Sequence, residues 1–311
     1  PDVFSTTTSG LGSNLVTMAY DKLIELNLRS TPQFRAIADK KVGNPTHDGS
    51  SIRFQFHNDI ADTTIAGATL AETVDPDAVA LSTPDQVTIT LNEYGNSVLV
   101  TRALELFSLA DVDPAIANII AFNLAGSIDT VAQTELRGGT NVIYGGTRTN
   151  TVTIAATDTI TSANIRKAVA KLRSGLSVPR KGSMYWAGIH PEVSHDLRAE
   201  TGAGGWRLPH EYNSNDNIWA GEIGSYEGAY FVESARMFND TDGASSAKVY
   251  RTILAGKEAM AEAVAEEPHV VIGPVIDQLM RFRPMGWYGV LGFKRYREAA
   301  LYRILNGSSV A

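Results

Sequence analysis

The 311-residue chain contains no cysteine, no apolar run long enough to cross a bilayer and no surplus of basic residues. The first absence excludes a disulfide-stapled secreted scaffold, and the second excludes a membrane-spanning helix. With 27 basic against 34 acidic side chains, general charge attraction to nucleic acid is excluded as the main binding mode. The start shows no charged segment followed by an apolar one. We therefore expect a soluble protein that is made in a reducing compartment, is not exported and binds no membrane.

Lysine and arginine are also absent from the 48 residues between Arg53 and Arg102. Around this tract the sequence alternates like strands at 51–56 and 87–91, whereas its middle is rich in Ala, Thr and Asp. The pattern predicts a long two-stranded arm with no core beneath it. Because an isolated hairpin is marginal in water, we expect the arm to lie on another subunit. A solvated acidic loop is the alternative. The acidic residues of the tract are Asp59, Asp62, Glu72, Asp75, Asp77, Asp85 and Glu93.

Basic residues instead gather at the C-terminal end. Residues 276–311 carry six of them against only Asp277 and Glu298. This asymmetry predicts that the arm of one subunit lies against a basic surface of the next. The residues expected at such contacts are Asp59, Asp62, Glu72, Asp75 and Asp77 on the arm, and Arg281, Arg283, Arg295 and Arg297 near the C-terminus.

A long helix is predicted at 113–137, where Asp113 and Pro114 fit its start and Gly138 its end. Its length suits a structural spine, although a long core helix would show the same periodicity. A shorter helical region is expected at 14–28.

The second half interleaves strands with short helices, which is typical of the α+β class. The tail at 278–305 is aromatic and β-branched, and it predicts strands that return to the spine, with interruptions at Pro284 and Gly292. Helices are expected at 162–174 and 191–199, strands at 184–189, 230–232 and 249–254, and a flexible loop at 202–205.

The sequence offers one cluster that could suggest catalysis, formed by His190, Glu192, His195 and Asp196. The two histidines are five residues apart, so they miss the four-residue spacing that places two zinc ligands on one helical face. A helix start explains the cluster better, because Pro191 suits the first turn. No nucleophile elbow or phosphate loop occurs. We therefore predict no catalytic, cofactor-binding or metal-binding residue, no cofactor and no enzyme; a soluble α+β enzyme is the less favoured alternative.

The tail also interleaves arginines with aromatic residues, which could suggest a stacking surface for single-stranded nucleic acid. Strand alternation explains the pattern more simply, with the aromatic side chains in the core and the basic ones facing solvent or a neighbour.

Several segments resemble, in the same order, the major capsid proteins of tailed bacteriophages of the phage N4 type. The most specific is Gly286–Ile304, with the sequence GWYGVLGFKRYREAALYRI. Shorter matching pieces are Leu91–Asn96, Asp111–Pro114, Ala187–Pro191 with Asp196–Arg198, and Gly221–Gly228.

The resemblance implies the Hong Kong 97-type (HK97-like) capsid fold. Its parts would be an N-terminal arm with helices at 1–50, an extended hairpin called the E-loop at 51–101, a peripheral domain at 102–179 with the spine helix 113–137, an axial domain at 180–275, and C-terminal strands at 276–311 that complete the peripheral domain.

The resemblance further implies a structural protein of the virion, made in the host bacterial cytoplasm. Its copies would form pentamers and hexamers that close an icosahedral shell around double-stranded DNA without sequence-specific binding, with scaffolding, portal or decoration proteins as further partners. Some capsids of this fold are locked by a lysine on the E-loop, but the arm has none here, so that cross-link cannot start from this loop. An encapsulin-like compartment is the alternative on the same fold, and the long N-terminal region favours the virus.

Overall fold

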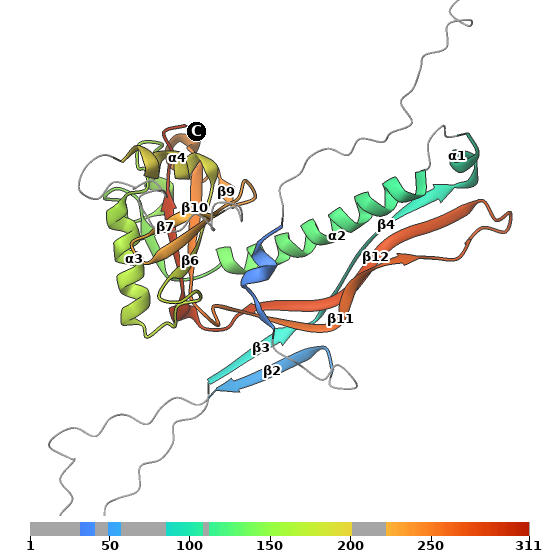
Figure 1. The fold of residues 1–311 in the computed structure, drawn as a ribbon, viewed down its shortest axis with the longest axis horizontal. Helices are drawn as coiled ribbons and strands as arrows, with labels where there is room; N and C mark the ends of the chain where they lie inside the picture. Colours follow the sequence, from blue (N-terminus) through green and yellow to red (C-terminus); the bar gives the residue numbers. More distant parts are fainter. Residues whose placement is uncertain (1–31, 41–48, 57–84, 108–111, 201–221, 311) are drawn as a thin grey trace, which may run out of the picture. The chain divides into compact units, whose positions relative to one another are not determined.

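The computed structural model describes residues 32–40, 49–56, 85–107, 112–200 and 222–310 (Figure 1). The chain divides into two compact units. Unit 1 contains Gly95–Asn123 and Val270–Trp287, and unit 2 contains Ser30–Tyr94, Leu124–His269 and Tyr288–Ala311. Expectations for 14–28, for the middle of the arm and for the loop at 202–205 lie outside the described residues.

A seven-stranded sheet forms the main body of unit 2. Its strands follow the order β5-β13-β10-β6-β8-β7, with β9 paired to β10. Parallel and antiparallel pairs both occur, since β6 runs parallel to β8 and antiparallel to β10. The bounds are β5 Val142–Tyr144, β6 Tyr185–Ile189, β7 Glu222–Tyr226, β8 Ala229–Glu233, β9 Asn239–Asp240, β10 Val249–Ala255 and β13 Leu301–Asn306.

Both faces of this sheet are covered, which explains why β6 is buried along its whole length. Tyr185 and Ile189 face one core with helices α3 (Ser162–Ser174) and α4 (Pro191–Ala199). Successive side chains of a strand point to opposite faces of the sheet, so Trp186 faces a second core, which includes part of α2 (Val112–Arg137). Each large apolar side chain buried in this way contributes about 1.5–3 kcal/mol.

Helix α2 is 26 residues long, which corresponds to about 39 Å at the helical rise, and it is the helix expected at 113–137. Two arginines bind the carbonyl groups at its C-terminal end. Arg295 Nη1 donates to Glu135 O at 2.9 Å, and Arg303 donates to the carbonyl oxygens of Arg137 and Gly139. Cations at this end are favoured by the helix dipole, so the tail strands return to the spine helix as the sequence predicts.

A second sheet has the strand order β1-β11-β12-β4. The sequence prediction for this sheet is wrong in two respects. Pro284 and Gly292 do not interrupt the tail, because β12 runs through both of them. The 13-residue strand β11 is not predicted at all, because it is rich in Ala and Glu and contains Pro268. The bounds are β1 Asp39–Lys40, β4 Asn92–Thr101, β11 Met260–Ile272 and β12 Phe282–Arg295; the short helix α1 spans Arg102–Phe107.

The base of the arm forms a two-stranded antiparallel sheet of β2 (Ser51–Phe56) and β3 (Asp85–Thr90). The expectation that no core lies beneath these strands is wrong here. Ile89 is fully buried in a small cluster with Ala261 and Ala263 of β11, and Ile52 packs against the same cluster. The arm is therefore anchored on its own subunit at its base.

Candidate assembly surface

Unit 1 carries most of the exposed apolar surface of the described residues. Thirteen of the seventeen large apolar side chains that are exposed lie there, whereas a lone exposed apolar residue is ordinary for a soluble chain. This concentration marks unit 1 as a surface for contact with another macromolecule. The thirteen are Val98, Leu99, Leu104, Leu106, Phe107, Ile119, Val270, Val271, Ile272, Val275, Ile276, Leu279 and Met280.

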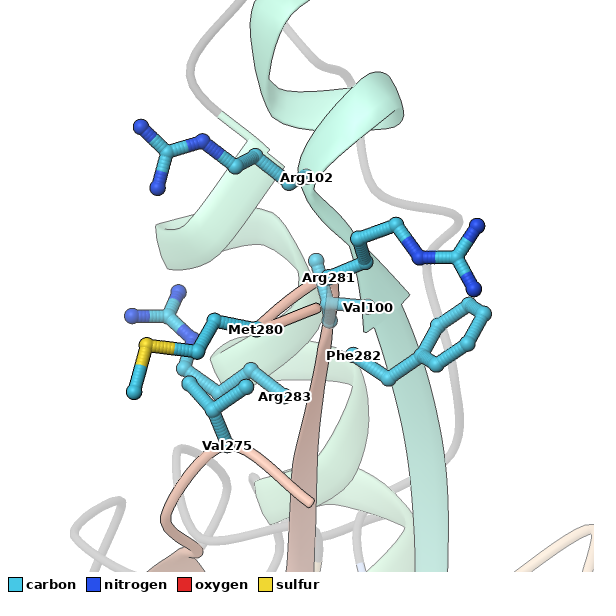
Figure 2. Close-up of a pocket in the computed structure, with 7 residues that line it drawn as sticks. All are labelled: Val100, Arg102, Val275, Met280, Arg281, Phe282 and Arg283. Atoms are coloured by element: carbon cyan, nitrogen blue, oxygen red, sulfur yellow. The ribbon is translucent and has the colours of Figure 1, made fainter. Parts of the chain in front are cut away.

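An open cavity of about 180 Å³ adjoins this surface, where the end of β4 meets the turn between β11 and β12 (Figure 2). Apolar and basic residues line it together. The lining residues are Val100, Arg102, Val275, Met280, Arg281, Phe282 and Arg283. Two of the arginines expected at subunit contacts, Arg281 and Arg283, therefore lie at one site, and sequence reasoning did not find the third, Arg102.

Among the described residues, the carboxylate of Asp277 lies beside one of the three arginines that line the cavity. Arg281 Nε donates to Asp277 Oδ2 at 2.8 Å, and its guanidinium lies 5.0 Å from the centre of the Phe282 ring. This hydrogen bond holds the pKa of the Asp277 carboxyl below its ordinary value. In Figure 2 the guanidinium groups of Arg102 and Arg283 extend to the side opposite Arg281. The arrangement can bind carboxylate or phosphate groups.

The other two expected arginines lie in unit 2 and have partners within the subunit. Arg295 forms ion pairs with Glu135 and Glu298, at 3.7 and 3.1 Å. Arg297 pairs with Glu258 at 3.4 Å, and its side chain is 51% exposed. The five acidic residues expected at contacts lie at 59–77, outside the described residues, so the pairing of arm and arginines stays a prediction.

A buried carboxylate on α2, which sequence reasoning missed, fastens the segment 32–40 to unit 2. Asp129 is 1% exposed, and it accepts hydrogen bonds from the backbone N–H of Phe34 at 2.6 Å and from Arg236 Nε at 3.2 Å. Phe34 and Ile37 of this segment are buried in the same core. The available signal was that Asp129 is the one charged residue in the stretch 115–134.

A second set of ion pairs joins the same segment to β11. Arg35 Nε donates to Glu262 at 2.8 Å, while Arg35 Nη2 and Lys40 Nζ donate to Glu267 at 2.8 and 2.9 Å. Glu262 is 1% exposed and Glu267 is exposed. Asp39 adds a third attachment, because it accepts hydrogen bonds from Arg180 and from the backbone N–H of Glu258. These contacts make the segment 32–40 part of the folded body.

Burial and ion pairing shift the pKa values of these carboxyl groups in opposite directions. Burial raises the pKa of Asp129 and of Glu262, although hydrogen bonds and charges from Phe34, Arg236 and Arg35 oppose the shift. Hydrogen bonds from Arg35 and then Lys40 lower the pKa of Glu267. The buried carboxyl groups therefore take up protons more readily than free ones, and Glu267 less readily.

The histidine cluster is a helix start, as the sequence predicts. His190 is the N-cap of α4, and its Nδ1 accepts the backbone N–H of Glu192 at 3.3 Å. Tyr250 donates to the Glu192 carboxylate, while Asp196 accepts the backbone N–H of Ser309 at 3.0 Å. Burial lowers the pKa of His190. These contacts are structural, because they cap the helix and pin the last residues of the described chain.

Among the described residues, no group of three or more His, Asp or Glu side chains is placed to hold a metal ion. The same residues include no helix with the length and apolarity that a bilayer crossing requires.

Comparisons with known proteins agree with the fold described above. No curated protein matches the sequence. Solved structures match at low identity and high coverage, which shows the fold. The capsid of Ralstonia phage GP4 has a TM-score of 0.76 and 16% identity, covering 98% of this chain and 99% of that one. The capsid asymmetric unit of cyanophage Pam1 has a TM-score of 0.75 and 14% identity, with 97% and 99% coverage.

The capsid of a native GTA particle matches with a TM-score of 0.64 and 17% identity, covering 98% of this chain and 100% of that one. The expected α+β fold of the Hong Kong 97 type is thereby confirmed, while the phage N4-type detail stays a prediction. The model of the family described as phage capsid protein matches residues 14–303. The chain therefore belongs to the phage capsid protein family and has the structural role of a major capsid protein.

Proposed function

We propose that copies of this chain form pentamers and hexamers that close an icosahedral shell around the double-stranded DNA of a tailed phage. Membership of the capsid family supports the formation of a shell. The excess of acidic over basic residues supports a container that does not adhere to its DNA. Synthesis in the host cytoplasm, and the participation of scaffolding, portal or decoration proteins, belong to the same proposal.

The concentration of exposed apolar side chains in unit 1 is the observation that best supports assembly through this chain's own surface. A soluble monomer rarely exposes a large contiguous apolar patch. A shell subunit buries such a patch against its neighbours. We infer that this surface and the arginine-lined cavity are covered in the assembled shell.

We also propose a role for each part of the chain. The arm at 51–101 reaches a neighbouring subunit as the E-loop. Helix α2 is the spine of a peripheral domain at 102–179, which the strands at 276–311 complete, and the sheet and helices at 180–275 form the axial domain. The N-terminal part, 1–50, precedes the arm. The contacts of Arg281, Arg283, Arg295 and Arg297 with the acidic residues Asp59, Asp62, Glu72, Asp75 and Asp77 of another copy are part of this proposal.

Expression of the full chain alone, followed by sedimentation and electron imaging, tests the assembly. We expect rings or closed shells that sediment far ahead of a 33.4 kDa monomer. A compact monomer at every concentration and salt would contradict the proposal and favour the enzyme alternative. Shells that contain a protein cargo in place of DNA when isolated from their natural source would favour the encapsulin-like compartment.

A further inference from the structure

Met280, at the rim of the arginine-lined cavity, has an unusual backbone. Its φ is 54°, in the left-handed region that side chains other than Gly, Asn and Asp rarely adopt. The residue ends a turn in which its N–H donates to Asp277 O at 2.9 Å. Its side chain is 71% exposed, so burial within the subunit does not offset the strain. A glycine or an asparagine would form the same turn at lower cost.

Most of the other non-glycine positions with positive φ in the described chain hold polar residues. The six non-glycine residues with positive φ are Leu176, Glu227, Ser245, Ser246, Glu258 and Met280, of which Leu176 and Met280 are the apolar ones. Met280 differs from Leu176 because it lines the cavity together with three arginines. An exposed apolar side chain on a strained backbone at such a rim indicates a role outside the isolated subunit.

The chemistry of the cavity defines what it can accept. Arg102, Arg281 and Arg283 supply donors for carboxylates, and Val275 and Met280 supply an apolar rim. In Figure 2 the Met280 side chain extends to the same side as the guanidinium groups of Arg102 and Arg283. A matching segment therefore combines carboxylates with apolar side chains and carries no cation.

The segment 57–84 of this chain has that composition. It contains five carboxylates and no Lys or Arg, and its large apolar residues are interspersed among them. Those apolar residues are Ile60, Ile65, Leu70, Val74, Val79 and Leu81. Charge complementarity thus favours a second copy as the source of the bound segment.

We propose that Met280 is a preorganised anchor, held in a strained conformation so that it covers the acidic segment 57–84 of a neighbouring copy once its carboxylates bind the arginines of the cavity. The proposal rests on the shell-forming function above and adds the residue that fits the two copies together. The stability of the subunit favours glycine or asparagine at position 280, whereas the contact between copies favours an apolar side chain. Methionine at this position strengthens the contact and destabilises the subunit.

Substitutions at position 280 separate the two demands. Met280→Gly and Met280→Asn relieve the backbone and remove the apolar anchor, so we expect the Tm of the dissociated subunit to rise by about 2 °C. The concentration required for assembly should rise about tenfold. Met280→Leu keeps the anchor and should assemble within about twofold of the wild type. Leu176→Gly, at an exposed apolar position of positive φ outside the cavity, is the matched control, with a similar gain in Tm and unchanged assembly.

The outcomes distinguish this proposal from the function on which it rests. Normal shells from both Met280→Gly and Met280→Asn would overturn the anchor alone, whereas a wild-type chain that never assembles would overturn both. Combining Met280→Gly with Glu72→Lys and Asp75→Lys tests the occupant. If the acidic segment binds here, the combined loss is smaller than the sum of the separate losses. A fully additive loss would assign the cavity to a different partner.

Discussion

Asp129 shows how one carboxylate can join parts of the chain that are distant in sequence. It lies on α2, yet it binds the backbone of Phe34, 95 residues earlier, and the guanidinium of Arg236, 107 residues later. An unpaired charge in this core would cost several kcal/mol, so both partners are needed. The contact places the segment 32–40 in the core before the arm begins.

The pKa shifts of this region predict opposite pH dependences for two variants. The raised pKa of Asp129 means that the folded subunit takes up a proton before the unfolded chain does, so the wild type gains stability relative to Asp129→Asn as pH falls from 7 towards 4. The lowered pKa of Glu267 has the reverse effect. Its contribution is complete above the ordinary value of 4.5 and is lost as pH falls through the lowered folded value.

Urea unfolding of the dissociated subunit between pH 7 and pH 3 measures both effects. The stability difference between wild type and Asp129→Asn should move in favour of the wild type on acidification, whereas the difference from Glu267→Gln should shrink below pH 4.5. Parallel curves for the two variants would contradict the assignment. Asp240→Asn, an exposed strand-end substitution, controls for the loss of one negative charge.

At the scale of elements, two glycines on long elements have opposite roles. A Cβ on Gly292 of β12 would collide with the carbonyl oxygen of Thr90 in β3, whereas a Cβ on Gly126 of α2 would meet only the flexible Arg236 side chain at 3.5 Å. Gly292→Ala should therefore destabilise the subunit by about 2 kcal/mol or more. Gly126→Ala should stabilise it by about 0.5–1 kcal/mol, because Ala favours the helix.

Thermal unfolding of the two glycine variants checks this difference, with the wild type measured beside them. Equal and small effects would show that β3 does not pack closely on β12. Reduced protection from hydrogen exchange at 85–90 in Gly292→Ala alone would confirm that the glycine holds the base of the arm in place.

The elements that the sequence predicts well are those with an unambiguous local signal. Helices α3 and α4 have the expected bounds, because their apolar spacing and the proline at position 191 mark them clearly. Strand β11 was missed because Ala and Glu favour helices and because its pairing with distant strands decides its conformation. Arg281 and Arg283 could be expected at a contact from charge alone. Arg102 and Met280 could not, because a cavity and a positive φ arise only when β4 and the β11–β12 turn come together.

At the scale of the whole molecule, the charges of the chain are divided between an acidic arm and arginines elsewhere. The arm has no lysine, so a covalent cross-link cannot start from a lysine of the arm, and the cohesion proposed above is non-covalent. Exposed ion pairs contribute little individually and are screened by salt. Several acting together at a closed contact can still decide whether neighbouring copies join.

A charge exchange tests this cohesion. Charge reversal on the arm, by Glu72→Lys with Asp75→Lys, should weaken assembly. Charge reversal in the cavity, by Arg281→Glu with Arg283→Glu, should weaken it as well. Both losses should be larger at low salt, because the repulsion between like charges is then less screened. Combining the two pairs restores opposite charges across the contact, so we expect shells to return at least partly. Sedimentation at several salt concentrations measures the effect, and circular dichroism verifies that each variant is folded. Since Arg281 also pairs with Asp277 of its own subunit, Arg281→Gln serves as the control for losing that internal contact. A four-residue variant that assembles no better than either pair would show that the acidic segment and the cavity do not meet.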